Sequence, residues 1–246
     1  MVNRVWHVEQ TTTVLALSII ISNIFAVGMC YNPLGLLRIP KCFDVREVKW
    51  NRTLTAIIGS VAGVLALNLY TEFLNLPNLM EQEFEGMIHN VYGVLAITIV
   101  APVAEEVLFR ESLLGGMLRG GVKPWKAILI SSLAFGILHI NPAQMLGASG
   151  IGILLAIVYW RTGNAVLPIL LHMLNNTFSV VQAWYLGDAV KEFSLTQYLG
   201  GTWPALVCAL CCTVACVYLF RHFLTHYPLH EGPTSAFVSD AENTSE

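Results

Sequence analysis

The long apolar segment 93–117 is interrupted by charged side chains. Glu105, Glu106 and Arg110 form the string Glu-Glu-x-x-x-Arg within it. A charged side chain at bilayer depth costs at least about 2.5–3.5 kcal/mol on insertion scales, so such residues are rare unless they are paired and face the protein interior. Glu106 and Arg110 share a helix face, whereas Glu105 is turned by about 100° from Glu106. We therefore expect a buried functional site in which the two acids have different partners.

Two further apolar segments carry polar residues at helical spacing. Phe135 precedes His139 by four positions, and His172 precedes Asn176 by the same interval. Residues four apart share a helix face, so each pair is expected to point in one direction. At a rise of about 1.5 Å per residue, these groups lie at depths comparable to that of Glu105. We expect all of them to converge in one cavity, near mid-membrane or somewhat toward the cytoplasm.

This set of polar side chains suits hydrolysis by an activated water molecule. A carboxylate and an imidazole can together deprotonate water, and His172 and Asn176 could donate hydrogen bonds to a developing oxyanion. The sequence has no Gly-x-Ser-x-Gly or His-Glu-x-x-His string, and no cysteine accompanies the two histidines. Singly, each residue could be structural, as an interhelical asparagine often is. Together they favour peptide-bond hydrolysis without an acyl-enzyme.

The elements that must position these residues are transmembrane helices. The 246 residues are 55% hydrophobic and only 12% charged, whereas soluble domains carry about 25% charged residues. A net charge of −3 without a basic cluster argues against nucleic acid as a partner. We predict an all-α, polytopic transmembrane helical bundle that forms a single domain over 1–225, with its motif core at about 85–190.

We assign seven spans, within a range of six to eight, because a helix needs about 20 residues to cross a bilayer. The fourth and fifth are short and are joined at Asn141-Pro142, so we expect them to be tilted or partly re-entrant. The polar tail, 226–246, is expected to be disordered and cytoplasmic. The predicted spans are 12–31, 53–74, 90–117, 126–144, 147–161, 165–186 and 201–221.

Lysine and arginine sort unevenly between the two sides of this assignment. Of the 13 basic residues, ten fall on one side, Arg4 and Lys191 fall on the other, and Arg110 lies inside the membrane. The positive-inside rule then places the N-terminus outside and the C-terminus in the cytoplasm. No small-x-small cleavage site follows the first apolar stretch, so we expect a retained span in a multi-pass protein of the cell membrane.

The three motifs resemble, in order, those of the CPBP family, which comprises the CAAX proteases and bacteriocin-processing enzymes and is also called the Abi family. The region of resemblance is about 85–190, and the compact chain is most similar to short bacterial members. The resemblance implies a membrane-embedded endopeptidase acting on a peptide or a lipid-modified protein, in CAAX-type maturation or in bacteriocin or signal-peptide processing. The motifs are Glu105-Glu106-x-x-x-Arg110, Phe135-x-x-x-His139 and His172-x-x-x-Asn176.

The resemblance also implies a role for each motif residue. Glu105 would be the general base, with His139 as its partner. His172 and Asn176 would stabilise the oxyanion. The remaining two residues would order the site or hold the substrate backbone, and these are Glu106 and Arg110.

The cofactor is a separate question, because the family has been described both as glutamate proteases and as metalloproteases. Glu105, His139 and His172 could supply three ligands to Zn²⁺. We favour a metal-independent water and no cofactor. The fourth charge of the segment, Glu111, matches no motif position and is expected to be structural or interfacial.

Two other functions stay open. The chain could be a non-proteolytic membrane protein that confers bacteriocin immunity or regulates a sensor. It could also be a proton-coupled transporter, since intramembrane Glu and His build proton relays. A transporter predicts inverted repeats and broken helices in both halves, and we find no convincing repeat in the sequence. The complete set of polar residues favours the peptidase.

Overall fold

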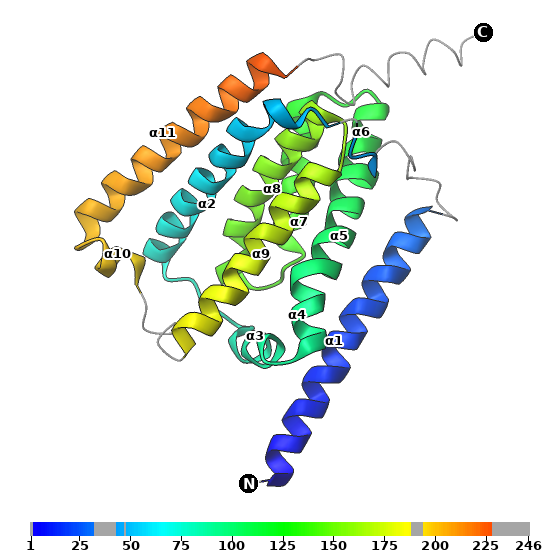
Figure 1. Cartoon of the computed structure of the whole chain (residues 1–246), viewed down its shortest axis with the longest axis vertical. Helices are drawn as coiled ribbons and strands as arrows, with labels where there is room; N and C mark the ends of the chain where they lie inside the picture. Colours follow the sequence, from blue (N-terminus) through cyan, green and yellow to red (C-terminus); the bar gives the residue numbers. More distant parts are fainter. Residues whose placement is uncertain (1, 32–42, 47, 188–193, 228–246) are drawn as a thin grey trace.

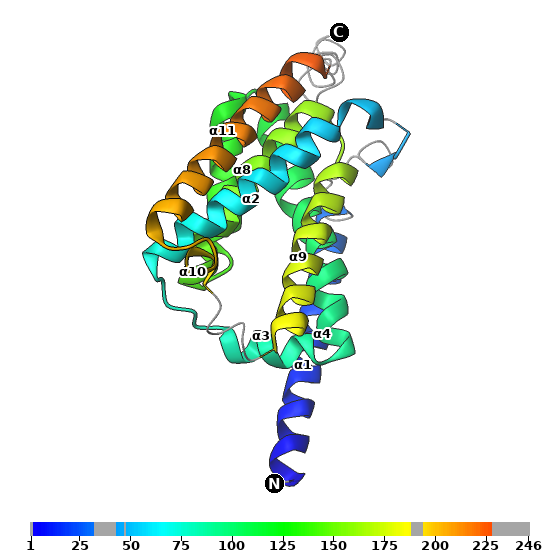
Figure 2. The ribbon, with the colours of Figure 1, turned by 60° about the vertical axis from the view of Figure 1, so that its left-hand side comes forward.

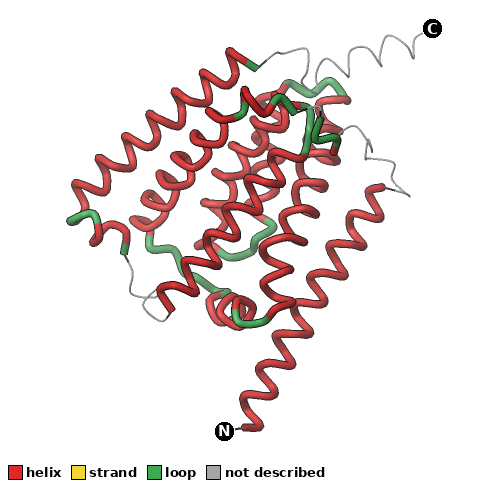
Figure 3. Tube along the Cα trace, viewed as in Figure 1, coloured by secondary structure: helices red, strands yellow, loops and turns green. Residues whose placement is uncertain are grey.

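The computed structural model describes residues 2–31, 43–46, 48–187 and 194–227, with the backbone alone for residues 2–9. Within these ranges the secondary structure is helical and no β-strand occurs (Figure 3). Six of the described helices are long and apolar enough to cross a membrane. The predicted all-α polytopic bundle is confirmed. The tail predicted over 226–246 begins too early, because His226 still belongs to α11 and Tyr227 is fully buried, and residues 228–246 lie outside the described residues.

The second and sixth predicted spans, 53–74 and 165–186, agree with α2 and α9 except at their first residue. Three short elements lie in the connections, namely the 3-10 helix η2 (Trp50–Arg52), α3 (Glu81–Ile88) and α10 (Leu195–Tyr198). The six long helices are α1 (Val2–Tyr31), α2 (Leu54–Leu74), the composite third span (Val91–Arg119), α8 (Pro142–Thr162), α9 (Val166–Leu186) and α11 (Thr202–His226).

The turn predicted at Asn141-Pro142 is confirmed, but the predicted bounds of the two spans that it joins, 126–144 and 147–161, are wrong. α7 (Pro124–Ile137) ends before residue 138, and α8 already begins at Pro142. A proline fits the first helical position because the amide hydrogen that it lacks has no partner there. α8 is therefore a full-length span, whereas the 14 residues of α7 reach only about 21 Å of a hydrocarbon core roughly 30 Å thick.

The turn after α7 is fixed by the loop between α2 and α3. Asn141 is fully buried, and its amide accepts a hydrogen bond from the Leu79 backbone (3.0 Å) and donates one to Asn78 Oδ1 (2.8 Å). The Ala143 amide also donates to the Pro77 carbonyl (3.2 Å). These bonds satisfy polar groups that would be costly to leave unpaired at membrane depth.

The third span is one continuous helix with two π-helical segments. It consists of α4 (Val91–Leu95), η3 (Ala96–Val100), α5 (Ala101–Glu106), η4 (Val107–Leu114) and α6 (Gly115–Arg119), of which η3 and η4 are the π-helical parts. π-Helical turns disturb the regular α-helical ladder and often occur at functional sites. In η4, the Phe109 carbonyl accepts a hydrogen bond from Ser131 Oγ on α7 (3.0 Å).

The third span lies between α1 on one side and α7 and α9 on the other (Figure 1). α2 and α11 pack together at the far edge of the bundle, which Figure 2 shows from a second direction. α1 begins at the lower end of the bundle and α11 ends at the upper end. The described chain therefore traverses the bundle an odd number of times, with α7 as the short traverse beside the six long helices.

Candidate active site

Glu106 and Arg110 form a fully buried ion pair across the boundary of α5 and η4. Arg110 Nε lies 2.9 Å from Glu106 Oε2, and both side chains are 0% exposed. The guanidinium carbon also lies 4.8 Å from the centroid of the Phe135 ring, a geometry in which a cation is attracted to the ring face. Since an uncompensated charge is very costly inside a protein, each member of this pair balances the charge of the other, although Arg110 Nη1 and Nη2 have no hydrogen-bond partner among the described residues. The structure thus brings together the two residues that the spacing paired.

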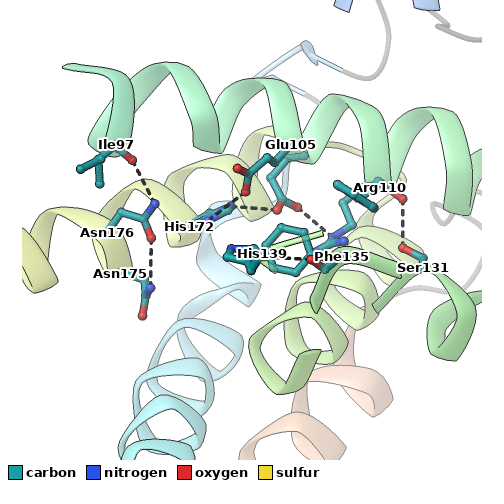
Figure 4. A network of polar contacts seen from close by, with 11 residues as sticks. Ile97, Glu105, Arg110, Ser131, Phe135, His139, His172, Asn175 and Asn176 are labelled. Carbon is teal, nitrogen blue, oxygen red and sulfur yellow. Dashed lines mark hydrogen bonds and ion pairs between the residues drawn. The ribbon is translucent and has the colours of Figure 1, made fainter. Parts of the chain in front are cut away.

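His172, on α9, lies between the two acids. Its Nδ1 is 3.0 Å from Glu106 Oε1, and its Nε2 is 3.8 Å from Glu105 Oε2 (Figure 4). Because a carboxylate accepts, Nδ1–H is the donor, and Nε2 is the nitrogen that faces Glu105. We expected Glu105 and Glu106 to have different partners. This expectation is wrong for His172, which lies beside both acids because α9 packs on α5.

Glu105 and His139 line one cavity of about 350 Å³. The Glu105 side chain is 26% exposed there, in contrast to the enclosed Glu106. His139 lies in the turn after α7, where its Nδ1 is 2.9 Å from the Phe135 carbonyl oxygen, so Nδ1–H donates and Nε2 keeps its lone pair in the neutral ring. The cavity is lined by Asn23, Glu105, Leu108, Phe109, Phe135, Leu138 and His139.

Phe135 connects the parts of the site, although the sequence analysis assigns it only a place in the second motif and no role. Its ring is 2% exposed and makes edge-to-face contacts with His139 (4.9 Å between centroids), His172 (5.6 Å) and Phe109 (5.2 Å). Such contacts orient rings as well as bury area. The signal that could have found this residue is its four-residue spacing from His139.

Asn176 lies one turn from His172 on α9 but is used for a helix contact. Its Nδ2 donates to the Ile97 carbonyl in η3 (3.0 Å), and its Oδ1 accepts from Asn175 Nδ2 (3.2 Å) (Figure 4). Asn176 is not among the side chains that line the cavity beside Glu105. The predicted convergence on one cavity is therefore wrong for Asn176, because its amide is directed at the first π-helical segment. It is also wrong for Glu106, Arg110 and His172, which are buried beside this cavity and do not belong to its lining.

Glu111 belongs to a second buried cluster on the same span. Its side chain is 2% exposed, it accepts a hydrogen bond from the Tyr159 hydroxyl of α8, and it lies 3.3 Å from Arg119. Gly115 leaves room for this cluster, since a Cβ there would lie 2.8 Å from the Tyr159 oxygen. Glu111 is therefore structural rather than interfacial, and it joins η4 to α8.

The described residues include no group of three His, Cys, Asp or Glu side chains arranged to hold a metal ion. Glu105, His139 and His172, the three candidate zinc ligands, form no such group. In both rings Nδ1–H bonds an oxygen, that of Glu106 for His172 and that of the Phe135 carbonyl for His139, so Nε2 is the nitrogen of each ring that could bind a metal.

Fold and site together define a multi-pass helical membrane protein with a buried acid–imidazole–guanidinium network beside a cavity. Residues 87–178 match the family described as Type II CAAX prenyl endopeptidase Rce1-like. The six candidate residues all lie inside the matched region, from Glu105 to Asn176. The resemblance to CAAX proteases that the three motifs predict is confirmed for this region.

Two curated relatives match parts of the chain. It is 34% identical over 88 residues to a Bacillus subtilis (strain 168) protein named "Putative membrane peptidase YdiL", over 36% of each chain. It is 29% identical over 101 residues to the membrane-embedded CAAX protease MroQ of Staphylococcus aureus (strain USA300). This second match covers 39% of the chain and 41% of the relative, so both matches cover well under half of the relatives' length. No solved structure matches the chain significantly.

Proposed function

We propose that this protein is an intramembrane endopeptidase that hydrolyses a peptide bond with a water molecule activated by Glu105. The observation that carries the proposal is a partly exposed carboxylate on a cavity, with the buried His172–Glu106–Arg110 network directly behind it. A carboxylate in this position can accept a proton from water, and fixed charges around it stabilise charge that develops in the reaction. The names of the family and of both relatives support the same class.

The proposed reaction begins when Glu105 takes a proton from water and the water oxygen bonds to the carbonyl carbon of the substrate. The carbonyl π electrons move to oxygen, which becomes the oxyanion. His139 lines the same cavity and is the proposed partner of Glu105 for orienting this water. The oxyanion electrons then re-form the carbonyl, the C–N bond breaks with its electron pair on nitrogen, and the proton on Glu105 passes to that amine. The new carboxylic acid and amine leave, and Glu105 is again a carboxylate.

His172 is the proposed oxyanion donor, and Glu106 is the residue that orients it. Protonated on both nitrogens, the ring donates Nδ1–H to Glu106 (3.0 Å) and directs Nε2–H to the space beside Glu105. Asn176 is proposed to assist by holding α9 against the Ile97 carbonyl. The substrate class that the family suggests is a membrane-associated peptide or a lipid-modified protein.

The water is proposed to be metal-independent, because a carboxylate and an imidazole on one cavity, Glu105 and His139, can activate it together. Elemental analysis of the purified protein, with activity measured before and after dialysis against a chelator, tests this point. Unchanged activity without bound metal is expected. Stoichiometric zinc whose removal abolishes activity and whose return restores it would contradict the proposal.

The main test is cleavage of a synthetic peptide mixture by the purified protein in lipid nanodiscs, with new termini identified by mass spectrometry. Glu105→Gln keeps the shape of the side chain but removes the base, and we expect a loss of about 10²- to 10⁴-fold. Glu81→Gln, on the exposed helix α3, is the matched control and should cleave normally. Undiminished cleavage by Glu105→Gln would refute the proposed base. A Glu105→Gln, His139→Ala variant that is fully functional in cells would instead favour the immunity or regulatory role.

We further propose that the N-terminus is outside the cell and the C-terminus is cytoplasmic. Apart from the buried Arg110, the described basic side chains belong to segments at the end of the bundle where α11 ends, and α3 carries Glu81, Glu83 and Glu85 at the opposite end (Figure 1). This asymmetry is the one that the positive-inside rule describes. In a cysteine-free background on whole cells, an impermeant maleimide should label Glu83→Cys and not Lys123→Cys. The reverse pattern would refute the orientation.

A further inference from the structure

Two histidines lie one turn apart at the end of α11, at the upper end of the bundle in Figure 1. His222 and His226 are both exposed, and their rings are stacked, with 3.9 Å between centroids and 16° between ring planes. α11 lies outside the region 87–178 that matches the family, and the proposed peptidase reaction does not use either residue. The question is what two adjacent imidazoles at this end of the bundle can bind.

The hydrogen bonds of His226 fix which of its nitrogens is open. Nδ1 lies 2.8 Å from the His222 carbonyl oxygen and 2.9 Å from Thr225 Oγ1, and that hydroxyl itself donates to the His222 carbonyl (2.9 Å). Because a carbonyl only accepts, Nδ1–H is the donor, and Nε2 keeps its lone pair in the neutral ring. Metal-binding histidines almost always have this arrangement, in which one ring nitrogen bonds an oxygen and the other binds the ion.

The separation of the two rings suits a shared ion. A Zn–N bond is about 2.0–2.1 Å long, so one ion joins two nitrogens that are at most about 4.1 Å apart, or about 3.3 Å apart at the tetrahedral angle. The ring centroids are 3.9 Å apart, and exposed side chains change rotamer within nanoseconds, so both rings can turn a nitrogen toward one ion. Two histidines four positions apart on a helix are also the pair that binds zinc in the His-Glu-x-x-His motif.

The end of a helix is a favourable place for a cation. α11 ends at His226, and the last carbonyl groups of a helix carry partial negative charge. Two described cations lie close to the pair in the structure or the sequence. Arg52 Nη1 donates to the His226 carbonyl (3.2 Å), which directs its charge at the backbone, and Arg221 is turned by about 100° from His222 around the helix. Both arginines are exposed, so water and salt screen their repulsion of a bound ion.

We infer that His222 and His226 together bind one divalent transition-metal ion at the end of α11. Imidazole nitrogen suits Zn²⁺, Ni²⁺ and Cu²⁺, whereas Mg²⁺ and Ca²⁺ prefer oxygen ligands. The last turn that the ion would hold is tied to the segment before α2, because Arg52 bonds the His226 carbonyl and the Lys49 amide donates to the Tyr227 hydroxyl (3.3 Å). Metal binding should therefore stabilise the junction of α11 with this segment, whether or not the protein is a peptidase.

The experiment is calorimetric titration of Ni²⁺ into the full chain, freed of metal by a chelator and held without a polyhistidine tag in nanodiscs of zwitterionic lipid. Ni²⁺ is the probe because imidazole binds it well, whereas thiolates select Zn²⁺. The parent protein carries His230→Ala, since residue 230 continues the four-residue interval in the sequence. The parent should bind Ni²⁺ and gain a higher Tm. His222→Ala and His226→Ala should each weaken binding at least about tenfold, the smallest effect of losing only the partner that orients a ligand.

A matched control keeps both imidazoles and the net charge but breaks their spacing. Arg221→His combined with His222→Arg sets the histidines five positions apart, which turns them about 140° from each other. Both positions are exposed, so the helix should stay folded while Ni²⁺ binding and the rise in Tm are lost. His89→Ala, an exposed histidine that follows α3, should bind as the parent does. If the parent binds no Ni²⁺, or if the exchanged variant and both alanine variants bind it equally well, the inference is wrong.

Discussion

The substitution Glu106→Gln distinguishes the two adjacent acids by what each does for the folded protein. It removes a charge and keeps the shape, so Gln Oε1 can still accept a hydrogen bond from His172 Nδ1. In the wild type, Arg110 is 0% exposed and its Nε lies 2.9 Å from Glu106 Oε2. In the variant, Arg110 stays buried without this carboxylate. Breaking a buried pair in this way costs about 3–5 kcal/mol. By contrast, Glu105 is 26% exposed and its nearest ionisable partner atom is 3.8 Å distant, so Glu105→Gln should change stability by less than about 1 kcal/mol.

The assay is reversible unfolding of the purified protein in mixed micelles with increasing SDS, followed by circular dichroism and compared with peptide cleavage. Glu105→Gln should unfold like wild type and lose activity, whereas Glu106→Gln should unfold at lower SDS. Adding Arg110→Met to Glu106→Gln removes the orphaned charge and should recover most of the lost stability. A loss below about 1 kcal/mol in Glu106→Gln, or a further loss on adding Arg110→Met, would refute the view that the pair is held by mutual charge compensation.

Three further substitutions test the structure around the site by thermal unfolding in detergent. Tyr159→Phe removes the donor to the buried Glu111 carboxylate and should cost about 1–3 kcal/mol; an unchanged Tm would contradict the role of that cluster. Gly136→Ala places a Cβ 1.9 Å from Ser149 Oγ and should destabilise by about 1–3 kcal/mol, partly recovered by adding Ser149→Ala; a neutral effect would mean that α7 and α8 are not closely packed. Ile140→Gly should raise stability by up to about 1 kcal/mol, because Ile140 has φ +55° and glycine tolerates this region while losing more backbone entropy; a lower Tm would contradict strain at this turn.

Hydropathy and length were enough to predict the bundle but not every boundary within it. The second and sixth spans agree with α2 and α9 because polar or glycine residues end each apolar run. The predicted end of the fourth span, residue 144, is too late because Leu138 and Ile140 continue the apolar run past the end of α7. The π-helical segments of the third span are invisible in composition, because the helix register there depends on packing against α1, α7 and α9.

The site was predictable where its contacts lie within one helix and not where they cross between helices. The Glu106–Arg110 pair follows from four-residue spacing along one helix. The contact of His172 with both acids does not, since it depends on how α9 crosses α5. Their spacing along the sequence predicts that the motif residues lie at comparable depths. The interhelical angles decide which imidazole lies beside which carboxylate.

The charges of the third span show why one acid, and not its neighbours, is suited to accept a proton. Glu106 is compensated by Arg110 at 2.9 Å, and Glu111 has Arg119 at 3.3 Å. Glu105 has no Lys or Arg within ion-pair distance among the described side chains, and its contact is with His172, whose charge depends on protonation. A carboxylate that is held by a permanent cation gains little from a proton, whereas one beside an imidazole can exchange it. Glu106 and Glu111 thus stabilise the structure of the third span, and Glu105, which lines the cavity, is the acid available for the proposed reaction.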